Sequence, residues 1–117
     1  MNGESIAKQR ILVSKGTGDL VIDAQEIEWI EADDYYAAIH RRQERYLIRE
    51  SLASLEHRLD HNRFVRTHRS AIVNLDRVKE VRRATGETVL VLEGGTNIPV
   101  SRRRRARVGK LLRLHTK

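Results

Sequence analysis

The stretch that most constrains the fold is residues 64–74, FVRTHRSAIVN, in which two short apolar runs flank a polar segment. Runs of this length and composition, joined by polar residues, indicate two short strands connected by a turn. The apolar ends would lie in a core and the polar segment at the surface. This segment, residues 66–70, is called the polar turn below. Its guanidinium, imidazole and hydroxyl groups donate hydrogen bonds to phosphates and base edges.

Other short segments also alternate apolar and polar residues, as half-buried strands do. A helix is expected after Ser51, because serine is a favoured N-cap and an apolar stripe follows it. A closing helix is expected to run to Leu114 with Ser101 as its cap. The sequence therefore predicts a mainly β fold with one or two helices. The additional strands are expected at residues 10–14, 20–23, 26–33, 36–42, 45–49, 77–83, 88–93 and 97–100.

The length of 117 residues is sufficient for one domain. Residues 1–9 lack periodicity and are expected to form a tail or linker remnant, so that the domain spans residues 10–117. The chain has no cysteine, which excludes disulfides and cysteine-based zinc sites and fits a reducing cytosol. No apolar run approaches the roughly 20 residues of a membrane span. We therefore expect a cytoplasmic protein without a membrane partner.

Charge is distributed unevenly along the chain. Residues 1–60 hold 8 Lys/Arg and 12 Asp/Glu, whereas residues 61–117 hold 15 Lys/Arg and 4 Asp/Glu. The positive half contains the polar turn and an arginine run, which favours a polyanionic partner. On charge alone, a soluble basic protein without such a partner is an equally good alternative. A membrane surface is disfavoured, because bulky apolar residues do not interleave with the arginines.

The stretch at residues 64–74 resembles the signature of the LytTR DNA-binding domain of bacterial response regulators. Residues 27–36 (IEWIEADDYY), 46–56 (YLIRESLASLE) and 98–103 (IPVSRR) resemble the same family in the same order. The resemblance covers about residues 10–114. It implies an elongated arrangement of small antiparallel sheets, with about ten strands and a short helix between layers. It also implies sequence-specific binding of double-stranded DNA as the output domain of a two-component transcriptional regulator.

The resemblance implies that DNA is contacted by three loops, here near residues 34–38, in the polar turn and at residues 101–103. Arg69 and Arg102 are the expected base readers, because arginine donates bidentately to guanine O6 and N7, worth about 1–3 kcal/mol of discrimination. A phosphate contact or a solvated charge is the alternative for each. The remaining DNA-binding candidates are His68, Ser70, Arg66, Tyr35, Ala37, Ser101, Arg103, Arg104 and Arg105.

These candidates have different expected roles. Ala37 stands where some family members carry a long polar side chain. Alanine can contact a thymine methyl but cannot read a donor pattern, so either one base position is left unread or Tyr35 substitutes. His68 either donates to a phosphate or holds the turn by an internal hydrogen bond. Asn74 is expected to satisfy local backbone groups in a turn. Phosphate contacts, which set affinity and salt dependence, are expected from Arg66, Arg103, Arg104 and Arg105.

No catalytic constellation is found, and neither an enzyme nor a cofactor is expected. Asp33 and Asp34 are adjacent, and neighbouring side chains on a strand point apart. The histidines at positions 40, 57, 61 and 115 have no acidic partner at ligand spacing, which argues against a metal site. The alternative function is a basic β module for protein interaction or RNA binding. Aromatic residues are only 4% of the chain, too few for a typical base-stacking platform.

Further partners are implied by the resemblance alone. A receiver domain in the same full-length protein and a sensor histidine kinase would supply the signal. Two copies would form a homodimer on DNA, with the repeats in direct orientation, because adjacent sites raise the effective concentration of the second copy.

Overall fold

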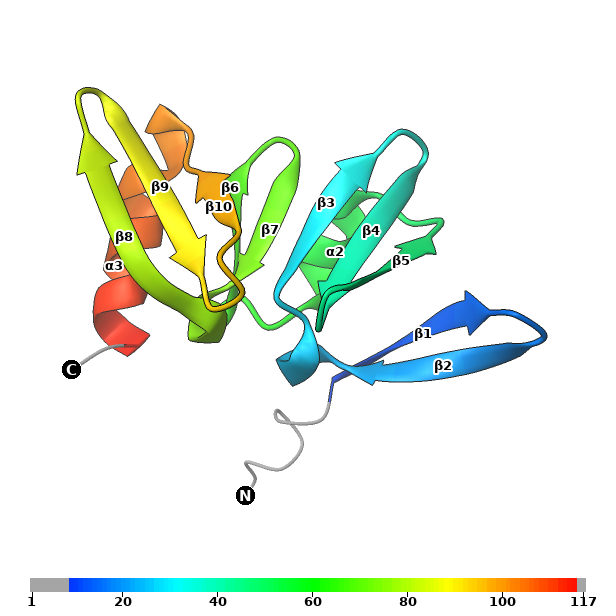
Figure 1. The fold of residues 1–117 in the computed structure, drawn as a ribbon. Helices are drawn as coiled ribbons and strands as arrows, with labels where there is room; N and C mark the ends of the chain where they lie inside the picture. The colour runs from blue at the N-terminus through cyan, green and yellow to red at the C-terminus, as the bar shows by residue number, and fades with distance from the viewer. Residues whose placement is uncertain (1–8, 116–117) are drawn as a thin grey trace, which may run out of the picture.

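A computed structural model describes residues 9–115, which form ten strands in three antiparallel sheets, two α-helices and three short 3-10 helices (Figure 1). The expected mainly β fold with small antiparallel sheets is confirmed. No helix among these residues is long and apolar enough to cross a membrane. The strands are β1 Arg10–Lys15, β2 Gly18–Asp23, β3 Trp29–Asp33, β4 Tyr36–Arg41, β5 Glu44–Ile48, β6 Phe64–His68, β7 Ala71–Asn74, β8 Val78–Ala84, β9 Glu87–Leu92 and β10 Asn97–Pro99.

The largest sheet has the strand order β5-β4-β3-β7-β6. Its centre is β3, which pairs with β4 along its whole length and with β7 through Trp29, Ile30 and Glu31. One face of this sheet is apolar and is covered by helix α2, Leu52–Arg58, and by the β1–β2 hairpin. The first core therefore joins Ile30, Ile72 and Leu55, all without exposed surface.

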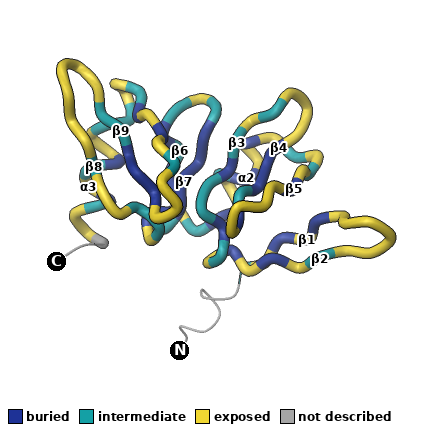
Figure 2. Tube along the Cα trace, in the orientation of Figure 1, coloured by how far each residue is buried: buried dark blue, intermediate teal, exposed yellow. Residues whose placement is uncertain are grey.

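The second core lies on the opposite face of the same sheet. Val65 and Val73 point to this side and pack with residues of β9, β10 and helix α3, Arg105–His115. Trp29 also packs here, half-buried and stacked on His40 at 4.3 Å between ring centroids. Its side chain therefore lies at the edge of this second cluster. Figure 2 shows buried residues along both β7 and β9, where the large sheet meets the β8–β9–β10 sheet.

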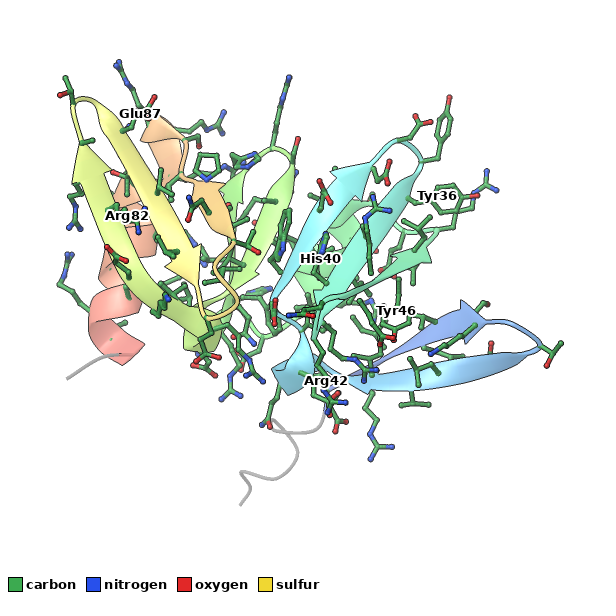
Figure 3. All side chains as sticks on the ribbon, viewed as in Figure 1. Tyr36, His40, Arg42, Tyr46, Arg82 and Glu87 are labelled. Atoms are coloured by element: carbon green, nitrogen blue, oxygen red, sulfur yellow. The ribbon has the colours of Figure 1, made fainter. Side chains whose placement is uncertain are left out.

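The β1–β2 hairpin and the β8/α3 layer lie at opposite ends of the molecule in Figure 1. Ile11, Val13 and Ile22 on the inner side of the hairpin belong to the first core. Tyr46, labelled in Figure 3, connects the hairpin to the large sheet, with the Lys15 ammonium 5.7 Å from its ring centroid.

Helices α2 and α3 begin in different ways. Ser51 caps α2 as expected, because its hydroxyl accepts a hydrogen bond from the Ser54 backbone N–H at 3.0 Å. The expected Ser101 cap of the closing helix is wrong. A 3-10 turn, Arg102–Arg104, precedes α3, and the Ser101 side chain makes no capping bond. Its hydroxyl is instead buried within the fold.

Two residues connect segments that are far apart in the sequence. Asn74 is fully buried, accepts from the Asp76 N–H at 3.0 Å and donates to the Ile27 carbonyl at 2.9 Å. Its expected structural role is confirmed and extends beyond the local turn. Gln9, assigned above to the tail, instead bonds to the fold through Arg58 and Asp60. The rest of the expected tail, residues 1–8, lies outside the described residues.

Candidate nucleic-acid interface

Three loops lie on one side of the molecule, the upper side in Figure 1. They are the β3–β4 turn, the polar turn, and the segment from Ser101 through the 3-10 turn. The polar turn begins inside β6, which extends to His68, so only Arg69 and Ser70 lie between β6 and β7. Because β3 and β7 are adjacent and antiparallel, the first two turns leave the sheet at the same end. Backbone hydrogen bonds connect the polar turn to the end of β3, which leads into the first loop, and to the third loop: Ala32 N–H donates to Ser70 O, and Ser101 N–H donates to Thr67 O, each at 2.9 Å.

His68 holds the polar turn from inside. Its Nδ1 accepts a hydrogen bond from the Ser70 backbone N–H at 3.1 Å, which supports the internal alternative for this residue. Burial, followed by the nearby guanidiniums of Arg66, Arg104 and Arg69, lowers the pKa of His68. The neutral ring is the form in which Nδ1 can accept, so these charges favour the observed bond.

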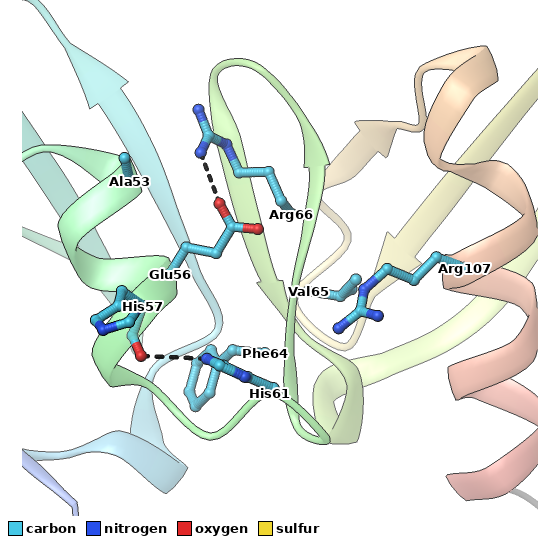
Figure 4. A pocket seen from close by; sticks show the side chains of 8 residues that line it. All are labelled: Ala53, Glu56, His57, His61, Phe64, Val65, Arg66 and Arg107. Atoms are coloured by element: carbon cyan, nitrogen blue, oxygen red, sulfur yellow. Dashed lines mark hydrogen bonds and ion pairs between the residues drawn. The ribbon is translucent and has the colours of Figure 1, made fainter.

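Arg66 holds the same turn from outside. Its guanidinium donates to the carbonyls of His68 and Arg69 at 3.0 and 2.7 Å. A third bond, at 3.0 Å, joins it to the Glu56 carboxylate on α2, as Figure 4 shows. The side chain is only 15% exposed. Arg66, expected at a phosphate, thus has three of its donors engaged within the protein.

Arg69 and Ser70 form the tip of the polar turn. The Arg69 side chain is exposed, while its own carbonyl is held by Arg66. The backbone N–H and C=O of Ser70 are both bonded inside the protein. The turn thus presents one cationic side chain from a backbone that is fixed at several points.

The β3–β4 turn presents Tyr35, whose side chain is 77% exposed. Asp34 precedes it with φ of 58°, a conformation that aspartate tolerates better than most residues. Ala37 is fully buried in the first core, so the expected contact between its methyl group and a thymine methyl is wrong. The alternation of β4 directs Ala37 to the α2 side, a direction that the turn sequence alone did not reveal.

The third loop presents Arg102 and Arg103, which are both exposed. Arg104 and Arg105 are half-buried, and the Arg105 guanidinium donates to the Gly86 carbonyl in the β8–β9 turn. The Ser101 hydroxyl is buried without a hydrogen-bond partner among the described residues, so it is not displayed to a ligand. Only two of the expected contacts in this segment therefore project freely.

A groove of about 490 Å³ lies between the first two loops and the start of α2. Tyr35, Arg49 and Arg69 line it. Sequence reasoning missed Arg49: it lies inside the family-like segment 46–56, but it directly follows β5 and falls outside the three loops expected to contact DNA. Among residues 9–115 there is no group of three or more His, Asp or Glu side chains that could hold a metal ion.

An arginine-bearing surface made of loops at one end of a sheet is suited to a polyanionic partner such as DNA. The profile of the LytTr DNA-binding domain matches residues 18–113. The chain belongs to the LytTR DNA-binding domain family.

Solved and curated relatives agree with this assignment. The LytTr DNA-binding domain of a putative methyl-accepting/DNA response regulator from Bacillus cereus superposes with a TM-score of 0.81 at 25% identity, covering 90% of this chain and 97% of that one. The heme-containing CO-sensing transcriptional regulator RcoM 2 of Paraburkholderia xenovorans is 37% identical over 88% of this chain and 39% of its own length. The sensory transduction protein LytT of Bacillus subtilis is 27% identical over 92% and 45%, respectively. The chain thus spans less than half the length of these curated relatives.

Proposed function

We propose that this domain binds double-stranded DNA sequence-specifically, with Arg69 and Arg102 contacting bases and Arg103 contacting phosphates. The observation that supports this most directly is the grouping of three loops on one side, linked by backbone hydrogen bonds. Fixed backbones allow an arginine fork to approach a guanine edge without a large ordering cost. Tyr35 is the candidate contact from the first loop.

The roles of His68, Arg66 and Ser70 change in this proposal. They position Arg69 by fixing the polar turn, rather than contacting bases themselves. Arg104 and Arg105 add positive charge behind the surface, and Arg105 also ties the third loop to the β8–β9 turn. The salt dependence of binding would come chiefly from the exposed arginines.

The test is selection of bound sites from a random duplex pool at about physiological salt, with Arg69→Ala and Arg102→Ala beside the wild type. Each variant is expected to relax a different position of one recovered motif by about 1–3 kcal/mol. Arg10→Ala, at an exposed site on the β1–β2 hairpin, is the charge-matched control and should retain the motif.

Other outcomes separate the alternatives. A motif that survives both changes with weaker binding makes the two arginines phosphate contacts. If no motif is enriched, the RNA or protein-interaction alternative gains support, and competition by single-stranded RNA then distinguishes between these two.

The wider context is also part of the proposal. The names of the relatives describe both CO-sensing and response-regulating proteins, so the signal can come from different input domains. A receiver domain with its histidine kinase is one such input, and a cytoplasmic location fits either. Homodimers on directly repeated sites remain the expected arrangement on DNA.

A further inference from the structure

The outer face of the β1–β2 hairpin carries an apolar pair exposed to solvent. Leu12 and Val21 are direct cross-strand partners and are 61% and 51% exposed. The same face carries Asp19 opposite Ser14 and an Arg10–Asp23 ion pair. Residues two apart on a strand share a face, so this surface is an apolar pair with the Asp19 carboxylate on one side and the Arg10–Asp23 ion pair on the other. It is called the hairpin face below.

A groove of complementary character lies between β8 and α3 at the other end of the molecule. It has a volume of about 230 Å³, and half-buried Val78, Val81 and Leu112 supply its apolar lining. Cationic groups surround it, from Lys79, Arg83 and Arg113. The one carboxylate in the lining, that of Glu80, is paired with Arg82. This is called the β8–α3 groove below.

We propose that the hairpin face of one copy docks into the β8–α3 groove of a second copy of this chain. Apolar side chains would meet an apolar lining, and the Asp19 carboxylate would meet the cationic rim. Hydrophobic burial and charge complementarity therefore favour the same pairing. The two surfaces lie at opposite ends of one molecule, so the contact is head-to-tail (Figure 1). A head-to-tail contact does not close on itself, and it produces rows rather than isolated dimers.

This contact between copies would act during DNA binding, so its role on DNA rests on the proposed function. The three loops lie on the upper side in Figure 1, while the β1–β2 hairpin and the β8/α3 layer lie at the two ends of the molecule. Copies bound to neighbouring sites in the same orientation bring a hairpin face next to a groove. Copies in opposed orientation bring two cationic grooves together. The contact therefore favours one relative orientation of sites.

The first experiment uses no DNA. Sedimentation velocity at low salt, up to about 1 mM protein, is expected to show concentration-dependent association beyond a dimer. Leu12→Ser/Val21→Ser should weaken it at least tenfold, whereas Leu47→Ser, which changes another exposed apolar residue, should not. A wild type that stays monomeric, or equal association in all three proteins, would overturn the proposal.

Mixing two variants tests the head-to-tail geometry. Lys79→Glu/Arg113→Glu alters only the groove, and thermal unfolding checks that the protein remains folded. Each variant alone should be monomeric, since it lacks one of the two surfaces. An equal mixture should give a dimer and nothing larger, because one intact hairpin face and one intact groove remain. A mixture without a dimer contradicts the contact.

The DNA experiment separates this contact from DNA binding itself. On a single selected site, both variants should bind within about twofold of the wild type. On two sites in the same orientation, the cooperativity of the wild type, about tenfold, should disappear in either variant. If the wild type does not bind a single site, the proposed function is rejected instead. The sedimentation experiment without DNA would still show whether two copies make the proposed contact.

Discussion

The polar turn and the β3–β4 turn lie on the same side of the molecule but are held in different ways. The polar turn is fixed by its own side chains, with His68 accepting from Ser70 and Arg66 bridging two carbonyls to α2. In the β3–β4 turn, Tyr35 stands almost fully in solvent. The polar turn is thus held rigid by side chains that hydrogen-bond to its own backbone. Of these two turns, only the polar turn has the support that a directional base contact requires.

The largest effect should come from removing the outer support. Arg66→Ala leaves two carbonyls and the Glu56 carboxylate without their donor. The free energy of unfolding should fall by about 2 kcal/mol, since hydrogen bonds involving a charged group contribute about 1.5–3 kcal/mol. Urea denaturation measures this change.

The same variant also tests the positioning role. Arg66→Ala should weaken specific DNA binding more than non-specific binding. Arg66→Lys, which keeps the charge but not the planar fork, should recover the non-specific part alone. Unchanged stability in Arg66→Ala would mean that the turn holds its shape without this bridge.

A second effect concerns pH. The lowered pKa of His68 means that the unfolded chain binds more protons than the native one between the native pKa and about 6.5. Stability should therefore rise with pH through this window and be lost as pH falls toward the native pKa. Melting temperatures from about pH 5 to 8 would show the slope. His68→Gln should flatten it, and an equal slope in both proteins would assign the effect elsewhere.

The contrasting loop should respond less. Tyr35→Ala should leave the free energy of unfolding within about 0.5 kcal/mol, as expected for an exposed residue. Its DNA affinity should fall by no more than about 1.5 kcal/mol, the value of one hydrogen bond. Tyr35→Phe separates the hydroxyl from the ring. A loss as large as that of Arg69→Ala would contradict the ranking of the two turns.

The smallest effect is expected in the third loop. Ser101→Ala removes a buried hydroxyl that bonds to nothing among the described residues, so stability should stay unchanged or rise by up to about 1 kcal/mol. A helix cap would instead cost about 1 kcal/mol on removal. Thermal unfolding distinguishes these two outcomes by their sign.

Local patterns predicted most of the secondary structure because they encode it directly. Ser51 followed by spaced leucines predicted α2, and the apolar runs on either side of the polar turn predicted β6 and β7. The burial of Ala37 could not be predicted in the same way. Alternation separates the two faces of a strand but does not say which one another layer will cover.

The candidate site was predictable in its positions but less so in its roles. An arginine in a surface turn looks the same in sequence whether it points outward, like Arg69, or returns to the backbone, like Arg66. Ser101 likewise matches a cap pattern, but its N–H bonds to β6, which comes from a distant part of the chain. Such choices depend on tertiary neighbours that no local window contains.

The position of β3 has a consequence for folding. This strand contributes Ile30 to one core and Trp29 to the other, on opposite faces of a single sheet. Its pairing with β7 joins segments separated by the whole β4–β6 region, so the entropy of closing this long loop must be overcome before either core is complete. Neither layer can then reach its native packing alone, and the chain gains and loses its structure as one cooperative unit.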